Sequence, residues 1–258
     1  MRLFKKILIS IVGLFLTLGI VFYATLRSNL PNDTFELTPP ATVGNLNVLV
    51  FGGTRNTGLE AVKLLTVRGD KVTAFVRETS DRSHLEPLGV EFVVGDAMDS
   101  GTIANAFAQS DFDAVITTIG NIRAKPAPDY IGNANIFDAA VAAGVKRVIM
   151  ISTVGAGDSK EAAPWISRLA LIKVIPLKTQ AEEHLRASGL DYTIIRPGGL
   201  PPGGGTGRGI LSEDPNTFGF IARPDLARLL VGVLDDDKTI GKTFAAIDPL
   251  RNAPWDDG

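Results

Sequence analysis

The chain has 258 residues, 45% of them hydrophobic, which suffices for one large domain or two small ones with sizeable cores. Its 26 basic and 28 acidic residues give a net charge of −2, and their mixture along the chain leaves no basic face for nucleic acid. The absence of cysteine excludes thiol catalysis, thiolate metal sites and disulfides. Neither histidine, His84 or His184, has partners at metal-ligand spacing, so no metal site is predicted.

Residues 7–26 form an apolar run without a charged side chain. A helix of this length rises 1.5 Å per residue and spans the ~30 Å of a bilayer core. The sequence therefore predicts a single-pass membrane anchor over residues 1–26. The alternative is a cleaved signal peptide, although the apolar centre of such peptides is usually only ~7–15 residues long. The basic residues Arg2, Lys5 and Lys6 favour a cytoplasmic N-terminus, with the rest of the chain across the membrane.

Residues 27–45 are polar and contain Pro31, Pro39 and Pro40, which indicates an extended linker. Residues 46–248 are predicted to form one domain, and residues 249–258 a C-terminal tail. Short apolar runs in the domain predict strands over residues 48–51, 72–76, 92–94, 114–118, 148–151, 193–195 and 243–247.

Helical patterns alternate with these strands. One helix has Leu59, Val62 and Leu65 on its apolar side and is expected to end at Gly69. Another, expected to end at Gly144, has an apolar side made of Ile136, Ala139, Ala140 and Ala143. Alternating strands and helices with continuously apolar strands predict an α/β fold with a doubly wound parallel sheet, the Rossmann type. Ligands of such sheets bind beyond the carboxyl ends of the strands.

A glycine-containing loop follows the first predicted strand and leads directly into a helix. Its residues are Gly52, Gly53, Thr54, Arg55, Asn56, Thr57 and Gly58. A strand, a glycine turn and a helix in this order place backbone N–H groups and a helix N-terminus against a pyrophosphate. The middle glycine of a full fingerprint is missing, because Arg55 or Asn56 occupies its place. A purely structural turn is the alternative interpretation.

The second predicted strand ends in Arg77, where an NAD-selective domain normally carries an acid that binds the ribose hydroxyls. A guanidinium suits a 2′-phosphate, with which it forms forked, charge-assisted hydrogen bonds. Arg55 could supply a second cation. The pattern favours NADP(H) over NAD(H) as the cofactor, and a solvated charge at the strand end is the alternative.

Two further strand ends are candidates for the same ligand. Asp96 and Ala97 follow the third strand, where a carboxylate could accept a hydrogen bond from the adenine amino group. Ile119, Gly120 and Asn121 follow the fourth, where a small residue lets the backbone approach the ribose and pyrophosphate.

The motifs GGTRNTG (52–58), VVGDAMD (93–99), DAVITTIG (113–120), AAVAAGVKRVIMIST (139–153) and KTQAEEHLRASGLDYTIIRPGGL (178–200) carry a family resemblance. Over about residues 46–248 the chain resembles the short-chain dehydrogenase/reductase superfamily, in particular its atypical NAD(P)H-binding branch. That branch includes NmrA-like proteins and relatives of biliverdin-IXβ and flavin reductases. The segment IARPDLARLLVGVL (221–234) is also similar to a helix of that branch.

The resemblance implies roles for particular residues. Lys178 matches a lysine that binds the nicotinamide ribose, and Thr153, beside Ser152, lies where the superfamily keeps a catalytic hydroxyl. Pro197 and Gly198, with the glycine that follows, match a loop near the carboxamide. Standard members carry a tyrosine proton donor four residues before the lysine, and here that position is Val174.

Two functions follow from these observations. The first is an NADPH-dependent reductase of a small, apolar carbonyl, quinone or flavin-type acceptor. The second, favoured by the missing tyrosine and the anchor, is a non-catalytic NADP(H)-binding scaffold or redox sensor of a membrane assembly. The glycine-rich residues 201–209 are either a substrate lid or a connector. A nicotinamide cofactor is expected in the cytoplasm, whereas the basic N-terminus favours a domain on the other side of the membrane. The sequence therefore does not determine on which side of the membrane the domain lies. It does not determine the oligomeric state either.

Overall fold

The computed structural model describes residues 13, 28–39, 44–253 and 255. The predicted anchor, residues 1–26, lies outside this description except for Gly13. No helix among the described residues is long and apolar enough to cross a membrane.

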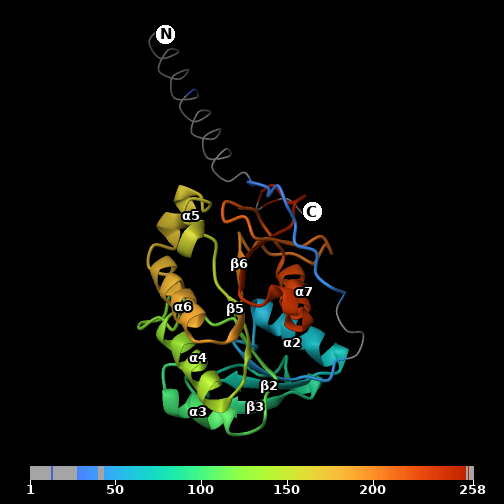
Figure 1. Cartoon of the computed structure of the whole chain (residues 1–258), viewed down its shortest axis with the longest axis vertical. Helices are drawn as coiled ribbons and strands as arrows, with labels where there is room; N and C mark the ends of the chain where they lie inside the picture. The colour runs from blue at the N-terminus through green and yellow to red at the C-terminus, as the bar shows by residue number, and fades with distance from the viewer. Residues whose placement is uncertain (1–12, 14–27, 40–43, 254, 256–258) are drawn as a thin grey trace, which may run out of the picture.

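One eight-stranded sheet forms the centre of the domain (Figure 1), in the order β3-β2-β1-β4-β5-β6-β8-β7. All neighbours pair in parallel except β7, which is antiparallel to β8. The strands are β1 (Asn47–Phe51), β2 (Lys71–Val76), β3 (Glu91–Val94), β4 (Ala114–Thr117), β5 (Arg147–Ile151), β6 (Asp191–Pro197), β7 (Ile210–Ser212) and β8 (Lys242–Ile247). The doubly wound parallel sheet is confirmed, and all seven predicted strands are present.

Helices cover both faces of the sheet. They are α2 (Asn56–Arg68), α3 (Ser100–Phe107), α4 (Ile131–Ala143), α5 (Trp165–Ala170), α6 (Ile175–Ala187) and α7 (Arg223–Gly232). Helices α2 and α7 pack together over one face, and α3, α4 and α6 over the other. Strand β1 shows why its run is continuously apolar: Val48 and Val50 belong to the first core, whereas Leu49 and Phe51 belong to the second.

Glycines end α2 and α4 as the sequence predicts. Gly69 and Gly144 have φ values of 99° and 75°, the left-handed conformation in which glycine closes a helix. The predicted apolar side of α4 is wrong at Ala143, which is exposed. The buried side of that helix follows Ile136, Phe137 and Ala140 instead, together with residues of its first turn.

Residues 28–39, here named the strap, fall within the predicted linker and lie along the domain. The backbone of Asn29 exchanges two hydrogen bonds with that of Phe218, at 2.7 and 3.0 Å. The amide of Phe35 donates to the carbonyl oxygen of Leu211 on β7, and the ring of Phe35 lies 4.8 Å from that of Phe244. The strap therefore covers the β7–β8 edge of the sheet.

Candidate cofactor site

The glycine loop has the geometry of a phosphate-binding turn. Gly52 has a φ of 87°, and a Cβ at Gly58 would lie 2.2 Å from the carbonyl oxygen of Gly52, so neither position tolerates a side chain. The loop leads into α2, whose N-cap residue, Arg55, makes no side-chain hydrogen bond to the helix. By contrast, the carboxylate of Asp99 caps α3. The N-terminus of α2 thus keeps backbone donors for an anion.

A cavity of about 370 Å³ lies beyond the carboxyl ends of the strands, in front of this loop. Twelve of the residues predicted to bind the cofactor line it: Gly52, Thr54, Arg55, Asn56, Thr57, Gly58, Arg77, Asp96, Ala97, Ile119, Gly120 and Asn121. They come from the ends of four successive strands, which confirms that these strand ends converge on one pocket.

Cations dominate the charged part of the cavity wall. Arg55, Arg77 and Arg223 line it, against the single carboxylate of Asp96 among the described residues. Arg55 and Arg77 are exposed, and within the described part of the chain neither guanidinium forms an ion pair. In a chain whose net charge is −2, this local excess of positive charge favours an anionic ligand.

Asp96 is partly engaged in its own loop. Its carboxylate accepts a hydrogen bond of 2.9 Å from the amide of Met98, and its amide donates to Thr102 Oγ1. Because the side chain stays exposed at the cavity wall, the carboxylate retains acceptor capacity for a ligand amino group.

The amine of Lys178 lies directly behind the cavity wall. Its Nζ donates to the carbonyl oxygens of Ile119 at 2.8 Å and Ile151 at 3.0 Å, two residues that line the cavity. Burial lowers the pKa of Lys178, and the carboxylates of Asp129, 3.9 Å away, and Glu182 oppose that shift. Lys178 therefore joins the ends of β4 and β5, but it is absent from the wall itself.

Asp129 also shapes the fourth strand end. Its Oδ2 accepts a hydrogen bond of 3.1 Å from the amide of Asn121, and a Cβ at Gly120 would lie 2.7 Å from its Oδ1. Glycine at position 120 is therefore required by the close approach of this buried carboxylate.

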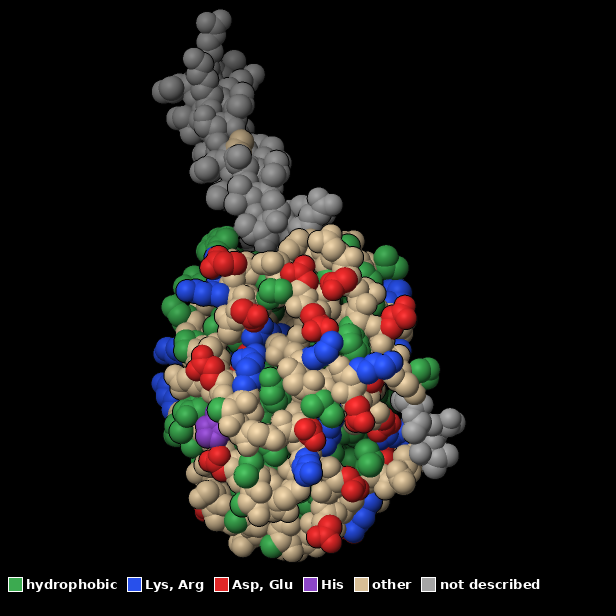
Figure 2. All heavy atoms as spheres, viewed as in Figure 1, with side chains coloured by type: hydrophobic (Ala, Val, Ile, Leu, Met, Phe, Trp, Pro, Cys, Tyr) green, Lys and Arg blue, Asp and Glu red, His purple; other side chains and the backbone are tan. Residues whose placement is uncertain are grey.

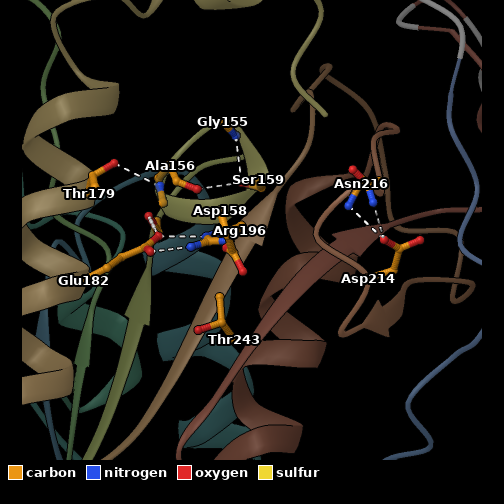
Figure 3. Close-up of polar contacts among 12 residues, drawn as sticks. Gly155, Ala156, Asp158, Ser159, Thr179, Glu182, Arg196, Asp214, Asn216 and Thr243 are labelled. Carbon is orange, nitrogen blue, oxygen red and sulfur yellow. Dashed lines mark hydrogen bonds and ion pairs between the residues drawn. The ribbon is translucent and has the colours of Figure 1, made fainter. Parts of the chain in front are cut away.

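The two hydroxyls that follow β5 have different surroundings. Ser152 Oγ donates to Glu182 Oε1 at 2.5 Å, inside a buried network (Figure 3) in which Glu182 of α6 and Arg196 of β6 point toward each other. Arg196 binds Glu182 through Nε at 2.9 Å and Nη2 at 2.6 Å, and Nη1 pairs with Asp158. Thr153 is half-buried, and its hydroxyl donates to the carbonyl of Val154 at 3.2 Å. Only Thr153 thus lies outside the ionic network.

Three other predicted residues support the site from behind the wall. Gly53 faces the core, where an added Cβ would meet Val62 and Val50. Pro197 ends β6 and is buried, and a Cβ at Gly198 would lie 2.0 Å from the carbonyl oxygen of Gly219. None of the three lines the cavity, and neither does Thr153.

No tyrosine lines the cavity among the described residues. Val174 is buried at the N-terminus of α6. Tyr130 and Tyr192 pack against the second core, and the ring of Tyr130 lies edge-on to His184. The described site therefore lacks a phenolic proton donor.

The glycine-rich segment is anchored to two buried carboxylates. The amides of Thr206 and Gly207 donate to Asp225 at 2.6 and 2.8 Å. The Thr206 hydroxyl donates to Asp248 at 2.8 Å, and Arg208 pairs with Asp248 at 3.0 Å. A lid motion of residues 206–208 would break these contacts, so the structure favours an ordered connector there.

Sequence reasoning missed several contributors to the wall, among them Arg223 and Leu200. Arg223 is the first residue of α7 and belongs to the segment 221–234 that resembles the family. The sequence showed this motif, but it did not show that Arg223 faces the cavity. Leu200 follows the RPGG sequence after β6.

Comparison with known proteins places this geometry in a family. A model of the NAD(P)H-binding family matches residues 52–237. The chain belongs to this family. The predicted resemblance to the atypical NAD(P)H-binding short-chain dehydrogenases/reductases is thereby confirmed.

Reductases are among the proteins to which this NAD(P)H-binding protein is similar. It is 33% identical to an uncharacterised sugar epimerase of Bacillus subtilis over 77% of this chain and 92% of that protein. It is 28% identical to the sanguinarine reductase of Eschscholzia californica over 77% and 88% of the two chains. The solved structure of an anaerobillin reductase from Escherichia coli O157:H7 matches with a TM-score of 0.73 and 29% identity, over 79% of this chain and 98% of the other.

Proposed function

We propose that the protein is an NADPH-dependent reductase of a small, apolar carbonyl, quinone or flavin-type acceptor. The observation that carries the proposal is the cavity at the strand ends, in which the glycine loop and three arginines face one space. Family membership supports a nicotinamide dinucleotide, and reductases among the relatives support hydride transfer.

The residues present fit NADPH. Donors at the N-terminus of α2 would bind the pyrophosphate, and Arg77 with Arg55 would bind the 2′-phosphate. The bound cofactor supplies a hydride. Lys178 holds the ends of β4 and β5 together and would donate to the nicotinamide ribose after exchanging one carbonyl partner. Thr153 does not line the cavity and would orient the acceptor oxygen only after exchanging the carbonyl of Val154 for it. Solvent would supply the proton because no described tyrosine lines the cavity.

The second candidate is a non-catalytic NADP(H)-binding scaffold or redox sensor. The buried Val174, which stands where standard members of the superfamily carry their tyrosine, favours it. The two candidates differ in turnover. The full chain, reconstituted in vesicles, is mixed with NADPH and a panel of quinones and flavins, and NADPH oxidation is followed by absorbance. Turnover supports the reductase, whereas tight binding by calorimetry without turnover supports the sensor.

We also propose that residues 1–26 remain attached as a membrane anchor. The support is the uncharged apolar run over residues 7–26. The mature protein should keep its first residues by intact-mass measurement and should stay in the membrane fraction after an alkaline carbonate wash. A mass that corresponds to loss of the apolar run would identify a cleaved signal peptide instead.

A further inference from the structure

Helix α5 presents an apolar face that nothing in the described chain covers. None of its six residues is buried. Trp165, Leu169 and Ile172 are 53%, 62% and 63% exposed, and their spacing of four and three residues puts them on one side of a helical segment. The backbone bond from Ile172 N to the carbonyl of Leu169 continues the helical turn. An exposed apolar stripe of this kind marks an interaction surface.

The strap begins at the same end of the domain as this helix (Figure 1). Ser28 Oγ donates to the carbonyl oxygen of Arg251 at 3.1 Å. Leu30 and Leu250, each within two residues of that contact, are 46% and 63% exposed. Asn29 pairs with Phe218, which belongs to a small apolar cluster with Val154 and Ala163, just ahead of α5. Phe218 thus connects the start of the strap, through this apolar cluster, to Ala163, two residues before α5.

The docked strap leaves almost no slack between the domain and the predicted anchor. The apolar run ends at Leu26, two residues before Ser28. Two residues of fully extended chain reach only ~7 Å. If residues 7–26 cross a bilayer, the end of the domain that carries Ser28 is held against that bilayer. A free linker over residues 27–45 would have allowed a reach several times longer.

We propose that the apolar face of α5, together with Leu30 and Leu250, inserts into the interfacial layer of the bilayer that holds the anchor. Lys173 flanks the stripe with positive charge of the kind found on interfacial helices, and Arg168, which pairs with Glu161 at 3.2 Å, lies next to it. Figure 2 shows hydrophobic side chains over α5, at the upper left, with charged side chains next to them. This inference rests on the membrane anchor proposed above and adds the orientation of the domain. It turns the carboxyl ends of β5 and β6 toward the lipid, so the acceptor is of a class that partitions into membranes.

Tryptophan fluorescence in vesicles tests this orientation. The chain has two tryptophans, so Trp255→Phe leaves Trp165 as the single reporter. The full-length variant is reconstituted in phosphatidylcholine vesicles whose acyl chains carry bromine near the carbonyl end or near the methyl end. An interfacial helix lies ~5–10 Å deep, so bromine near the carbonyl end should lower the emission by at least about twofold, and more than bromine near the methyl end.

The matched control moves the reporter to the other end of the domain. In Trp165→Phe/Trp255→Phe/Val141→Trp the single tryptophan lies in the last turn of α4, which leads to the amino end of β5. Val141 is 50% exposed, similar to Trp165, and its replacement should show no bromine quenching. Adding Leu169→Glu and Ile172→Glu to Trp255→Phe should abolish the quenching of Trp165, while NADPH affinity stays unchanged because both side chains are exposed.

Each other result overturns the proposal in a recognisable way. If the chain resists carbonate extraction but Trp165 is unquenched by bromine and accessible to acrylamide, the anchor stands and the orientation is wrong. If Trp165 is protected from both quenchers, protein covers α5, and a second copy is the occupant. If the chain leaves the vesicles on extraction, both the anchor and the orientation fail, while the reductase proposal is unaffected.

Discussion

Replacing Arg77 with alanine should weaken NADPH binding and leave NADH binding nearly unchanged. Arg77 lines the cavity at the end of β2, and no described carboxylate pairs with its guanidinium. A charge-assisted hydrogen bond contributes ~1.5–3 kcal/mol, and the exposure of the side chain argues for the lower part of that range. About 1.5–2 kcal/mol corresponds to an increase of roughly 10–30-fold in the Kd for NADPH.

Isothermal calorimetry with both cofactors measures this change. The matched control is Arg82→Ala, which removes a cation five positions away that lies over the ring of Phe92 instead of the cavity. Because Arg82 does not line the cavity, Arg82→Ala should leave the ratio of the two Kd values unchanged. Equal losses of NADPH and NADH affinity in Arg77→Ala would show that Arg77 does not bind the 2′-phosphate.

Three further predictions concern the site, the glycine-rich segment and the anchor. Lys178→Ala should impair cofactor binding and turnover together, whereas Thr153→Val should lower only turnover. Calorimetry measures the binding of each variant and steady-state kinetics its turnover. A fully active Thr153→Val variant would show that this hydroxyl has no role in the reaction. Burial raises the pKa of Asp248, but hydrogen bonds from Thr206, the amide of Leu250 and Arg208 outweigh it, so the pKa is lowered overall. Its ionised form then stabilises the fold above about pH 4. By urea unfolding, Asp248→Asn should cost ~1–3 kcal/mol at pH 7, and an equal cost below pH 4 would contradict this assignment. A chain without residues 1–26 should leave the membrane fraction and still bind NADPH, because the strap is kept; aggregation without binding would refute the separate anchor.

The sequence was informative wherever a physical requirement acts on neighbouring residues. Strands covered on both faces need continuous apolar runs, so β1 and the other parallel strands were visible. Gly52 and Gly58 are six residues apart because one turn must bring the strand end and the helix start together. Arg77 was identified from its place at the end of a strand.

Features that depend on distant partners were not predictable in this way. Strand β7 has three residues and pairs in antiparallel with β8, so its apolar pattern is too short to stand out. Arg223 reaches the cavity only because α7 packs beside α2 over the same face of the sheet. Glu182 and Arg196 look like a solvated helix charge and a strand residue until the fold buries them together.

The strap also fixes the order in which the protein can be completed. Its first residue binds Arg251, 223 positions later in the chain. At 5–20 residues per second, roughly 10–45 s of synthesis separate the two partners. The apolar N-terminal run therefore leaves the ribosome long before the surface that receives the strap exists. The strap can therefore complete its contacts along the β7–β8 edge only after β7, β8 and the C-terminal residues have been made. A nascent or prematurely terminated chain lacks this closure, and its unpaired edge is open to pairing with other chains.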